Sequence, residues 1–370
     1  MKFKALFLLF ILTSLTFAQQ QRRIVQPVND GNMVRLAGTV HPRLASATDQ
    51  GAVSPTMQLH GMRLVFSRSP QQQTALDQLL AEQQDPNSAN YHKWLTPEEF
   101  GAQFGLAQAD IVTLSAWLTA QGFTVDSVAR GRDFIVFSGI AAQVEAAFHA
   151  PIHNYLVGGK AHFAASTDVS IPGAFSGVVS GVTGLHNFAP KARNIKAQPR
   201  VTSSITGNHF IVPGDFATIY NLPSYSAGVP CTGAPPACLN GTGQTIAIVG
   251  QSNLSTDSNP GRNGTPGVNG QQYDLVTFRN LAGLPALGTA PTFQIVIVPP
   301  YGDPGVAADA AEANLDVEWS GAAAPNANLI FVVENSNNGG DGAFGALVYA
   351  VDNNLAPVIS VSYGVCEAQL

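Results

Sequence analysis

Apolar positions in the first 190 residues of this chain occur in two patterns, one typical of strands and one typical of helices. Residues 30–60 lack a clear periodicity, which favours an irregular lead-in. Beyond them, apolar runs predict strands and apolar positions three or four apart predict helices. Strands are expected at Met62–Ser67, Thr124–Val128 and Phe134–Phe137, a hairpin at Tyr155–Phe163 turning at Gly158-Gly159, and helices after Pro70, after Thr96, near Ala107–Gln121 and near Ala141–His149. This mixed order predicts a small α+β sandwich.

Two helix starts carry specific capping signals. Ser69 precedes Pro70, which suits a cap followed by a first-turn proline. Thr96 stands three residues before Glu99, so the two side chains are placed to form a capping box.

The second half of the chain has a different pattern. Short runs rich in Ile and Val occur at Thr245–Val249, Phe293–Val298, Leu329–Val333 and Val358–Ser362, with helical stretches near 308–322 and 341–353 between the later ones. Strands that alternate with helices predict parallel pairing, with helices on both faces of the sheet. The basic, polar stretch from Ala189 to Thr206 predicts an exposed linker between the halves.

The N-terminus of the chain indicates export. The chain begins Met-Lys-Phe-Lys, continues with an apolar run from Ala5 to Phe17 and has a small residue at Ala18, which is typical of a secretory signal. An uncleaved membrane anchor is the alternative. Export permits a disulfide between Cys231 and Cys238. That pairing leaves Cys366 over, and its partner is expected in sequence beyond this chain.

Charge divides unevenly between the halves. Residues 211–370 hold 12 acids and 2 bases, and subtraction from the totals of 24 and 18 leaves 12 acids and 16 bases in residues 1–210. The halves therefore carry about −10 and +4, which suits two parts that dock on each other, although ordinary surface composition remains an alternative. An acidic half argues against nucleic-acid binding, since phosphate contacts need Lys and Arg.

Candidate chemistry in the second half depends on carboxylates. The last of the eight histidines is His209, so no Ser-His-Asp arrangement can be assembled after it. Glu312 and Asp316 are four residues apart and share a helix face. Two neighbouring carboxyls can share a proton and can accept one from a hydroxyl in acid. An ordinary solvated acidic face is the alternative, and Asp309, Glu318 and Trp319 are interpreted as capping, surface and packing residues.

A family resemblance adds to this hypothesis. The run Asp85-Pro-Asn-Ser-Ala-Asn-Tyr-His-Lys-Trp-Leu-Thr-Pro-Glu-Glu-Phe100, followed by Gln103-Phe104-Gly105, closely resembles the activation domain of the sedolisin (serine-carboxyl) peptidases, the group that includes kumamolisin. Glu312 and Asp316 stand where that family has its catalytic Glu and Asp. Val358-Ile-Ser-Val-Ser-Tyr-Gly364 is similar to the strand that lines the substrate cleft in this family and in subtilisins.

The resemblance implies a ferredoxin-like α+β prodomain followed by part of a subtilisin-like α/β domain with a parallel sheet. It divides the chain into a signal peptide (1–18), an activation domain (30–188), a linker with a processing site (189–206) and the N-terminal part of the catalytic domain (207–370). Glu312 would be the general base for a serine, Asp316 would orient it, and main-chain groups of Ser362, Tyr363 and Gly364 would bind peptide as an added strand. The family's Gly-Thr-Ser serine, its oxyanion aspartate and its calcium site have no counterpart here, so no metal ligand is assigned.

The sequence therefore predicts a secreted serine-carboxyl peptidase precursor that acts at acid pH through a Ser-Glu-Asp triad, with the serine expected beyond Leu370. Its expected partners are a peptide or protein substrate and its own prodomain docked on the catalytic domain. The 370-residue chain alone is expected to be inactive. The alternative is a non-catalytic secreted product that acts as a prodomain-type inhibitor or binding module.

Overall fold

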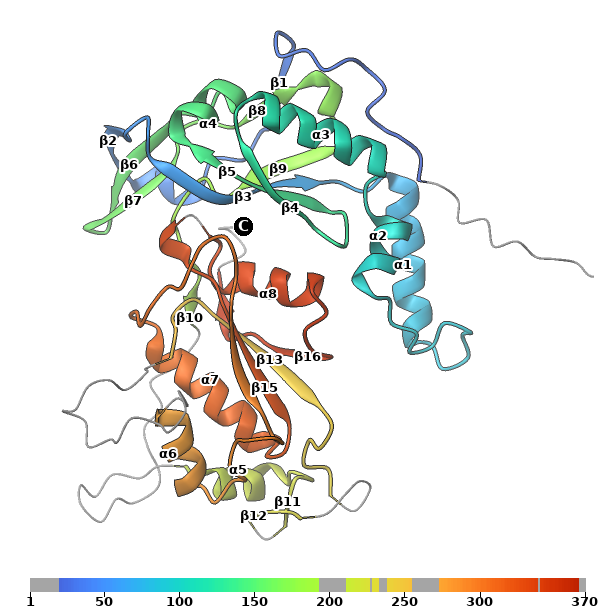
Figure 1. Ribbon diagram of the computed structural model, residues 1–370, viewed down its shortest axis with the longest axis vertical. Coiled ribbons are helices and arrows are strands. Elements are labelled where there is room, and N and C mark those ends of the chain that lie inside the picture. Colours follow the sequence, from blue (N-terminus) through green and yellow to red (C-terminus); the bar gives the residue numbers. More distant parts are fainter. Residues whose placement is uncertain are drawn as a thin grey trace, which may run out of the picture.

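The computed structural model describes residues 20–192, 211–226, 228–232, 238–254, 273–338 and 340–365. Figure 1 shows two folded parts: an N-terminal part of antiparallel strands and helices (residues 20–188), and a C-terminal part around a parallel sheet (residues 211–365). The predicted signal peptide (1–18), most of the predicted linker and Cys366 lie outside the described residues. Within the described ranges, no helix is both long and apolar enough to cross a membrane.

The N-terminal part is built on antiparallel sheets. Its central sheet has the order β4-β5-β3-β9, formed by Thr124–Val128, Phe134–Ile140, Gln58–Phe66 and Val179–Thr183. A second sheet, β2-β6-β7, is formed by Thr48–Ala52, Ile152–Val157 and Lys160–Ala165. A short pair joins β1 (Met33–Arg35) to β8 (Ser170–Pro172). Two 3₁₀ turns, η1 (Pro42–Ser46) and η2 (Gly173–Phe175), complete this part.

The helices of the N-terminal part start where the sequence predicts. Helix α1 (Pro70–Gln84) begins with a capping box in which Ser69 Oγ accepts from the Gln72 amide at 3.2 Å and Gln72 Oε1 accepts from the Ser69 amide at 3.0 Å. Helix α2 (Pro97–Phe104) repeats this arrangement with Thr96 and Glu99. Both caps satisfy amides that a helix start leaves unpaired. Helices α3 and α4 cover Gln108–Ala120 and Ala141–Phe148.

The lead-in predicted for residues 30–60 is wrong. Strands β1 and β2 and the start of β3 lie there, and β2 pairs with β6 while β1 pairs with β8. All five residues of β2 are exposed, so that strand has no buried face. A strand without a buried face gives no apolar alternation, and pattern reading therefore misses it.

The C-terminal part contains the predicted parallel sheet. Its order is β14-β15-β13-β16, formed by Phe293–Ile297, Asn328–Val333, Thr245–Gly250 and Val358–Ser360. Helix α7 (Ala310–Ala323) packs on one face and α8 (Ala343–Asp352) on the other, so the prediction of helices on both faces is confirmed. The remaining elements are α5 (Pro213–Tyr220), α6 (Tyr273–Leu281), η3 (Ser336–Asn338), the β11–β12 pair (Tyr225–Ser226 and Val229–Pro230) and the β10–β17 pair (Lys191–Ala192 and Tyr363–Gly364).

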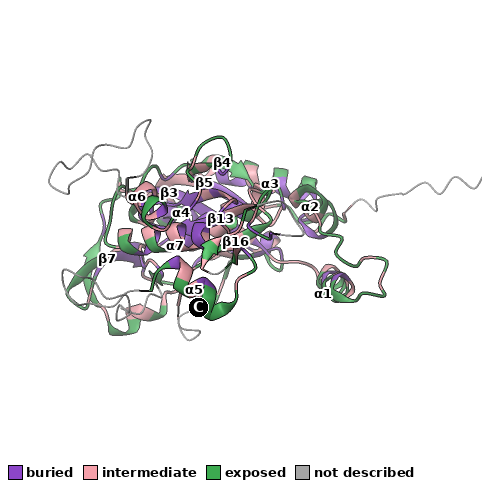
Figure 2. Cartoon of the chain, turned by 90° about the horizontal axis from the view of Figure 1, so that it is seen from below, coloured by how far each residue is buried: buried purple, intermediate pink, exposed green. Residues whose placement is uncertain are grey.

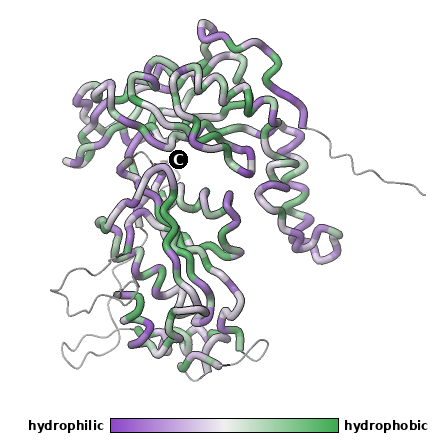
Figure 3. Tube along the Cα trace, in the orientation of Figure 1, coloured by the Kyte–Doolittle hydropathy of each residue, from purple (hydrophilic) through white to green (hydrophobic). Residues whose placement is uncertain are grey.

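The apolar cores differ between the two parts. A large cluster in the N-terminal part joins β3 and β5 to α3 and α4, for example through Leu64, Phe137 and Phe148, and a smaller one is formed by Tyr155, Ala164 and Phe188. In the C-terminal part, Ala247 and Val249 face α8, whereas Ile248 faces α7. The buried strands of both parts appear in purple in Figure 2, and the parallel strands form the hydrophobic centre of the lower part in Figure 3.

The predicted disulfide is present. Cys231 and Cys238 are bonded, with their Cα atoms 5.9 Å apart. The bridge lies after the β11–β12 pair and before β13, in a stretch of the C-terminal part with little regular structure.

Candidate active site

Polar side chains gather where the parallel strands end. Gln251 directly follows β13, Glu334 directly follows β15, and Ser362 lies two residues after β16. The carboxyl ends of parallel strands meet at one edge of a sheet, and in open α/β sheets this edge is the usual ligand-binding side. The N-terminal turns of α7 bring Glu312 and Asp316 to the same edge. Asp316 is hydrogen-bonded to Ser362 there, and both carboxyls lie close enough to Tyr363 to affect its pKa.

The predicted acid pair is not a solvated helix face. Glu312 is buried, with 2% of its surface exposed, and Asp316 is partly buried. Asp316 Oδ1 accepts a hydrogen bond from Ser362 Oγ at 2.8 Å. Burial raises the pKa of Asp316, and the hydrogen bond from Ser362 opposes that rise. A partly desolvated carboxyl next to a buried one is suited to hold or transfer a proton in acid.

Tyr363 connects the acid pair to the predicted substrate strand. Its side chain is buried, and its pKa lies well above the usual range because of burial and the nearby charges of Asp309, Asp316 and Glu312. Its main chain forms β17 together with Gly364. The structure therefore brings together all five residues that the sequence assigned to the site: Glu312, Asp316, Ser362, Tyr363 and Gly364.

The chain's own linker pairs with this strand. Strand β10 (Lys191–Ala192) runs antiparallel to β17, with Lys191 opposite Gly364 and Ala192 opposite Tyr363. Peptides that bind by strand addition form the same kind of main-chain pairing. A segment that directly follows the N-terminal part thus occupies the strand edge that the sequence analysis assigned to substrate.

Gln251 and Asp309 belong to the site although the sequence analysis did not place them there. The Gln251 Nε2 atom donates to the Pro190 carbonyl at 2.9 Å and also to Asp309 Oδ2. Asp309 takes the N-cap position of α7 but makes no side-chain cap bond. The interpretation of Asp309 as a capping residue is therefore wrong in its chemistry: its carboxylate orients Gln251. No sequence signal marks a lone glutamine, so only its position after a β-strand could have drawn attention to it.

Comparison with known proteins identifies the N-terminal part. Residues 45–188 match the model of the pro-kumamolisin activation domain. Sedolisin of Pseudomonas sp. (strain 101) is 27% identical over 314 residues, which are 82% of this chain and 48% of that protein. The chain is thus similar to precursors of the sedolisin family, with the activation domain at residues 45–188. It is also 28% identical to xanthomonalisin of Xanthomonas sp. (strain T-22) over 53% of the chain and 24% of that protein, and 28% identical to mouse tripeptidyl-peptidase 1 over 51% and 34%.

The chain spans less than half of the length of these relatives. The match to the activation-domain model and the similarity to sedolisin confirm the family resemblance that rests on the run containing Tyr91-His-Lys-Trp94.

A buried ion cluster joins the activation domain to the sheet edge. Arg63 of β3 lies between Glu334, at 2.9 Å, and Asp341. Burial opposes a charged guanidinium, but the two carboxylates raise the pKa of Arg63 above its usual value. Burial raises the pKa of Glu334 to about 7 against the lowering effect of Arg63.

A close main-chain contact lies beside this cluster. Tyr301 Oη donates to the Gly61 carbonyl, and a Cβ at Gly61 would lie 2.0 Å from the tyrosine ring. Gly61 also has φ +63°, which favours glycine. Both features make Gly61 the residue that lets the C-terminal part approach β3.

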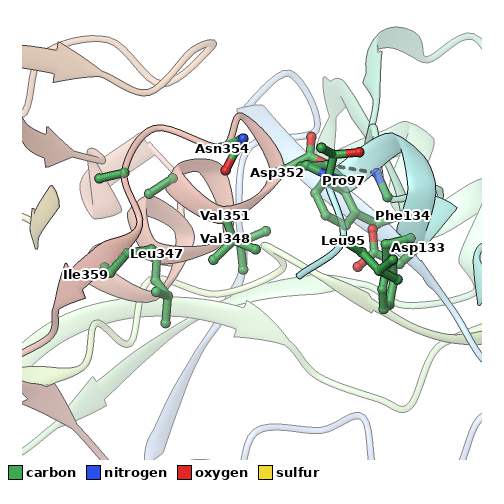
Figure 4. A pocket seen from close by; sticks show the side chains of 15 residues that line it. Leu95, Pro97, Asp133, Phe134, Leu347, Val348, Val351, Asp352, Asn354 and Ile359 are labelled. Atoms are coloured by element: carbon green, nitrogen blue, oxygen red, sulfur yellow. Dashed lines mark hydrogen bonds between the residues drawn. The ribbon is translucent and has the colours of Figure 1, made fainter. Parts of the chain in front are cut away.

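A largely apolar cavity of about 540 Å³ lies farther along the same interface, away from the acid pair. Figure 4 shows its lining, with Leu95, Pro97 and Phe134 from the activation domain facing Leu347 and Val351 of α8. One hydrogen bond closes its rim, from the Gly131 amide to Asp352 Oδ1 at 2.9 Å. The two parts therefore meet through polar contacts that surround an apolar space.

Three histidines lie where the activation domain meets the linker. The His41 and His162 rings stack on Phe188 with centroids 4.4 Å away, and His186 lies edge-on to His41 at 4.6 Å. Burial, then His186, Arg43 and His162, lower the pKa of His41 to about 4. Burial also lowers the pKa of His186, although Asp341 opposes this. Burial thus favours the neutral rings of His41 and His186, and His186 lies four residues before Pro190.

Trp319 and Glu318, on the same helix as the acid pair, contact neighbouring residues of the C-terminal part. Trp319 packs against Phe216 and Phe278, as predicted. Glu318 is wrongly interpreted as a surface residue, since burial and the charge of Asp274 raise its pKa to about 7. Within the described ranges, no group of three or more His, Cys, Asp or Glu side chains is arranged to hold a metal ion.

Proposed function

We propose that the full-length product of this gene is a secreted serine-carboxyl peptidase precursor that hydrolyses peptide bonds at acid pH. The observation that carries the proposal is the pairing of β10 with β17 beside the buried acid pair, which presents a peptide segment to proton-transferring groups. The family names of the relatives support the reaction class. Because the chain covers less than half of sedolisin, the catalytic serine is proposed to come from sequence that follows Leu370.

In this mechanism, Glu312 accepts the proton of the serine hydroxyl as its oxygen attacks the peptide carbonyl. Glu312 then donates that proton to the leaving amine when the peptide bond breaks, and a water molecule repeats the cycle on the acyl-enzyme. Asp316 holds a second proton position next to Glu312, and its bond from Ser362 ties the carboxyl to the strand that binds substrate. A carboxyl base still accepts a proton at a pH where an imidazole is already charged.

Finer features of the fold and location are part of the same proposal. We assign residues 30–188 to a ferredoxin-like prodomain, 189–206 to a processed linker and 207–370 to part of a subtilisin-like domain. The signal at residues 1–18 directs export. The family resemblance implies a calcium ion for the full-length protein, and no step of the mechanism uses it. Within the described residues, no group of three or more His, Cys, Asp or Glu side chains is arranged to hold a metal ion.

The test is peptide hydrolysis by the full-length protein at acid pH with Glu312→Gln. The amide keeps the size of the side chain but cannot accept a proton, so kcat should fall roughly 10²- to 10⁴-fold. Glu318→Gln on the same helix is the matched control and should keep near wild-type kcat, because Glu318 faces Asp274 instead of the strand edge. Equal activity of the Glu312→Gln protein would overturn the assignment. Inhibition of a related peptidase without any hydrolysis would instead favour the non-catalytic alternative.

A further inference from the structure

We propose that Gln251 is a substrate-binding residue: its side-chain amide binds the main-chain carbonyl of the peptide residue just before the segment that pairs with β17. The role of Gln251 in binding substrate rests on the proposed function. The ligand is an extended peptide of any sequence. It must extend one residue on the amino side of the two residues that pair with β17.

The geometry of the linker supports this role. Pro190 immediately precedes β10, and its carbonyl accepts from Gln251 Nε2 at 2.9 Å in a buried setting. Proline has no amide hydrogen, so the carbonyl is the hydrogen-bonding group that Pro190 offers through its main chain. Every residue carries such a carbonyl, and the contact therefore selects for peptide length and not for side chain.

The side chain of Gln251 is held in one orientation. The Asp309 carboxylate accepts the second hydrogen of Gln251 Nε2. Because a carboxylate only accepts hydrogen bonds, it must face the NH2 end of the amide and not its oxygen. This contact fixes which end of the amide faces the peptide. Asp309 is thus a positioning residue at the start of the helix that carries Glu312 and Asp316.

The surrounding chain leaves space for this glutamine. Gln251 is 8% exposed, and a Cβ at Gly342 would lie 2.5 Å from Gln251 Oε1. Gly342 therefore makes room for the amide beside α8. A buried polar side chain that bonds to a segment 61 residues away in sequence is costly unless its hydrogen bonds are made.

The first experiment uses the 370-residue chain and needs no enzymatic activity. Lys191 is exposed but its main chain is paired, so added trypsin should cut after it only when β10 detaches. Gln251→Leu should speed this cut roughly 3- to 10-fold, the effect of one lost hydrogen bond. Gln244→Leu, at the exposed opposite end of β13, is the matched control and should cut at the wild-type rate.

Asp309→Asn tests the positioning role of Asp309, since an asparagine no longer fixes the orientation of the Gln251 amide. It should speed cleavage after Lys191 less than Gln251→Leu does. Thermal unfolding midpoints of all variants identify any that fail to fold, and Gln251→Glu provides a second variant without the donor. Equal cutting rates after Lys191 in folded wild-type and Gln251→Leu chains would overturn the proposal.

The second experiment measures the full-length protein on a peptide series that grows one residue at a time toward the amino end. In the wild type, KM should drop at the length that supplies the Gln251 contact, and in Gln251→Leu that drop should be absent. If trypsin reveals the loosened linker but no peptide is hydrolysed by any variant, the peptide contact stands and the proposed function falls. An identical drop in KM with both proteins would overturn the contact for substrate.

Discussion

The two parts of this molecule satisfy their buried carboxylates in different ways. The activation domain has one large apolar core, and its buried Asp110 accepts hydrogen bonds from the amides of Arg23 and Ile24 in the same part. The C-terminal part divides its core between two faces of a sheet, and its buried Glu334 obtains its cation from the other part. The buried Asp110 is thus satisfied within its own part, whereas Glu334 at the sheet edge and Arg63 of the activation domain depend on each other.

Removal of Arg63 tests this dependence most strongly. Arg63→Met leaves Glu334 and Asp341 without their cation, and loss of one partner from a buried pair costs about 3–5 kcal/mol. Chemical denaturation of the 370-residue chain should therefore show a large loss of stability.

Two further variants serve as controls for Arg63. Arg130→Met removes an exposed ion pair with Glu98 and should leave the denaturation midpoint unchanged. Adding Glu334→Leu to Arg63→Met should restore part of the loss, because no buried carboxylate then lacks a partner at that position. A stable Arg63→Met single variant would mean that the C-terminal part does not need this counter-charge.

The disulfide gives a second contrast, since the described residues of the activation domain contain no cysteine and the C-terminal part is bridged. Cys231→Ala combined with Cys238→Ala should destabilise the C-terminal part by about 2 kcal/mol, from the loop-closure entropy of a short loop. Hydrogen exchange followed by mass spectrometry should show faster exchange in β13 and β15 but not in β3 and β5. Equal effects on both parts would show that they unfold as one unit.

The histidine cluster predicts a smaller, pH-dependent effect. The pKa of His41 is lowered from its usual 6.5 to about 4, so the folded state favours the neutral ring. This contribution to stability is present above pH 6.5 and is lost as pH falls through 4, where positive charge builds up beside Arg43, His162 and His186.

His41→Asn keeps an acceptor for the Arg43 amide and should flatten the loss of stability between pH 6.5 and 4. The exposed His92→Asn is its control, and thermal unfolding across this range is the measurement. An unchanged slope with His41→Asn would remove the cluster from the account of acid sensitivity.

Much of the fold could be predicted from local patterns. The caps at Ser69 and Thr96 and the four Ile/Val runs of the parallel sheet all depend on residues close in sequence. The strands within residues 30–60 could not be predicted, because β2 has no buried face to leave a pattern.

The site could be predicted only in part, for a related reason. Glu312 and Asp316 share one helix face, so their spacing was informative, and the family resemblance located Ser362–Gly364. The contact between Arg63 and Glu334 joins residues 271 positions apart, and the contact between Gln251 and Pro190 joins positions 61 apart. Only tertiary structure brings such pairs together, and neither has a spacing that marks it.

The most direct test of the central claim is acid processing of the full-length precursor, with the new N-terminus determined by mass spectrometry. The account predicts that the wild-type mature product begins after Ala192 and before Pro213, because β10 pairs with β17 beside the acid pair and α5 begins at Pro213, and that Glu312→Gln stays unprocessed. A mature product that begins within the activation domain, or a Glu312→Gln precursor processed at the wild-type rate, would contradict it.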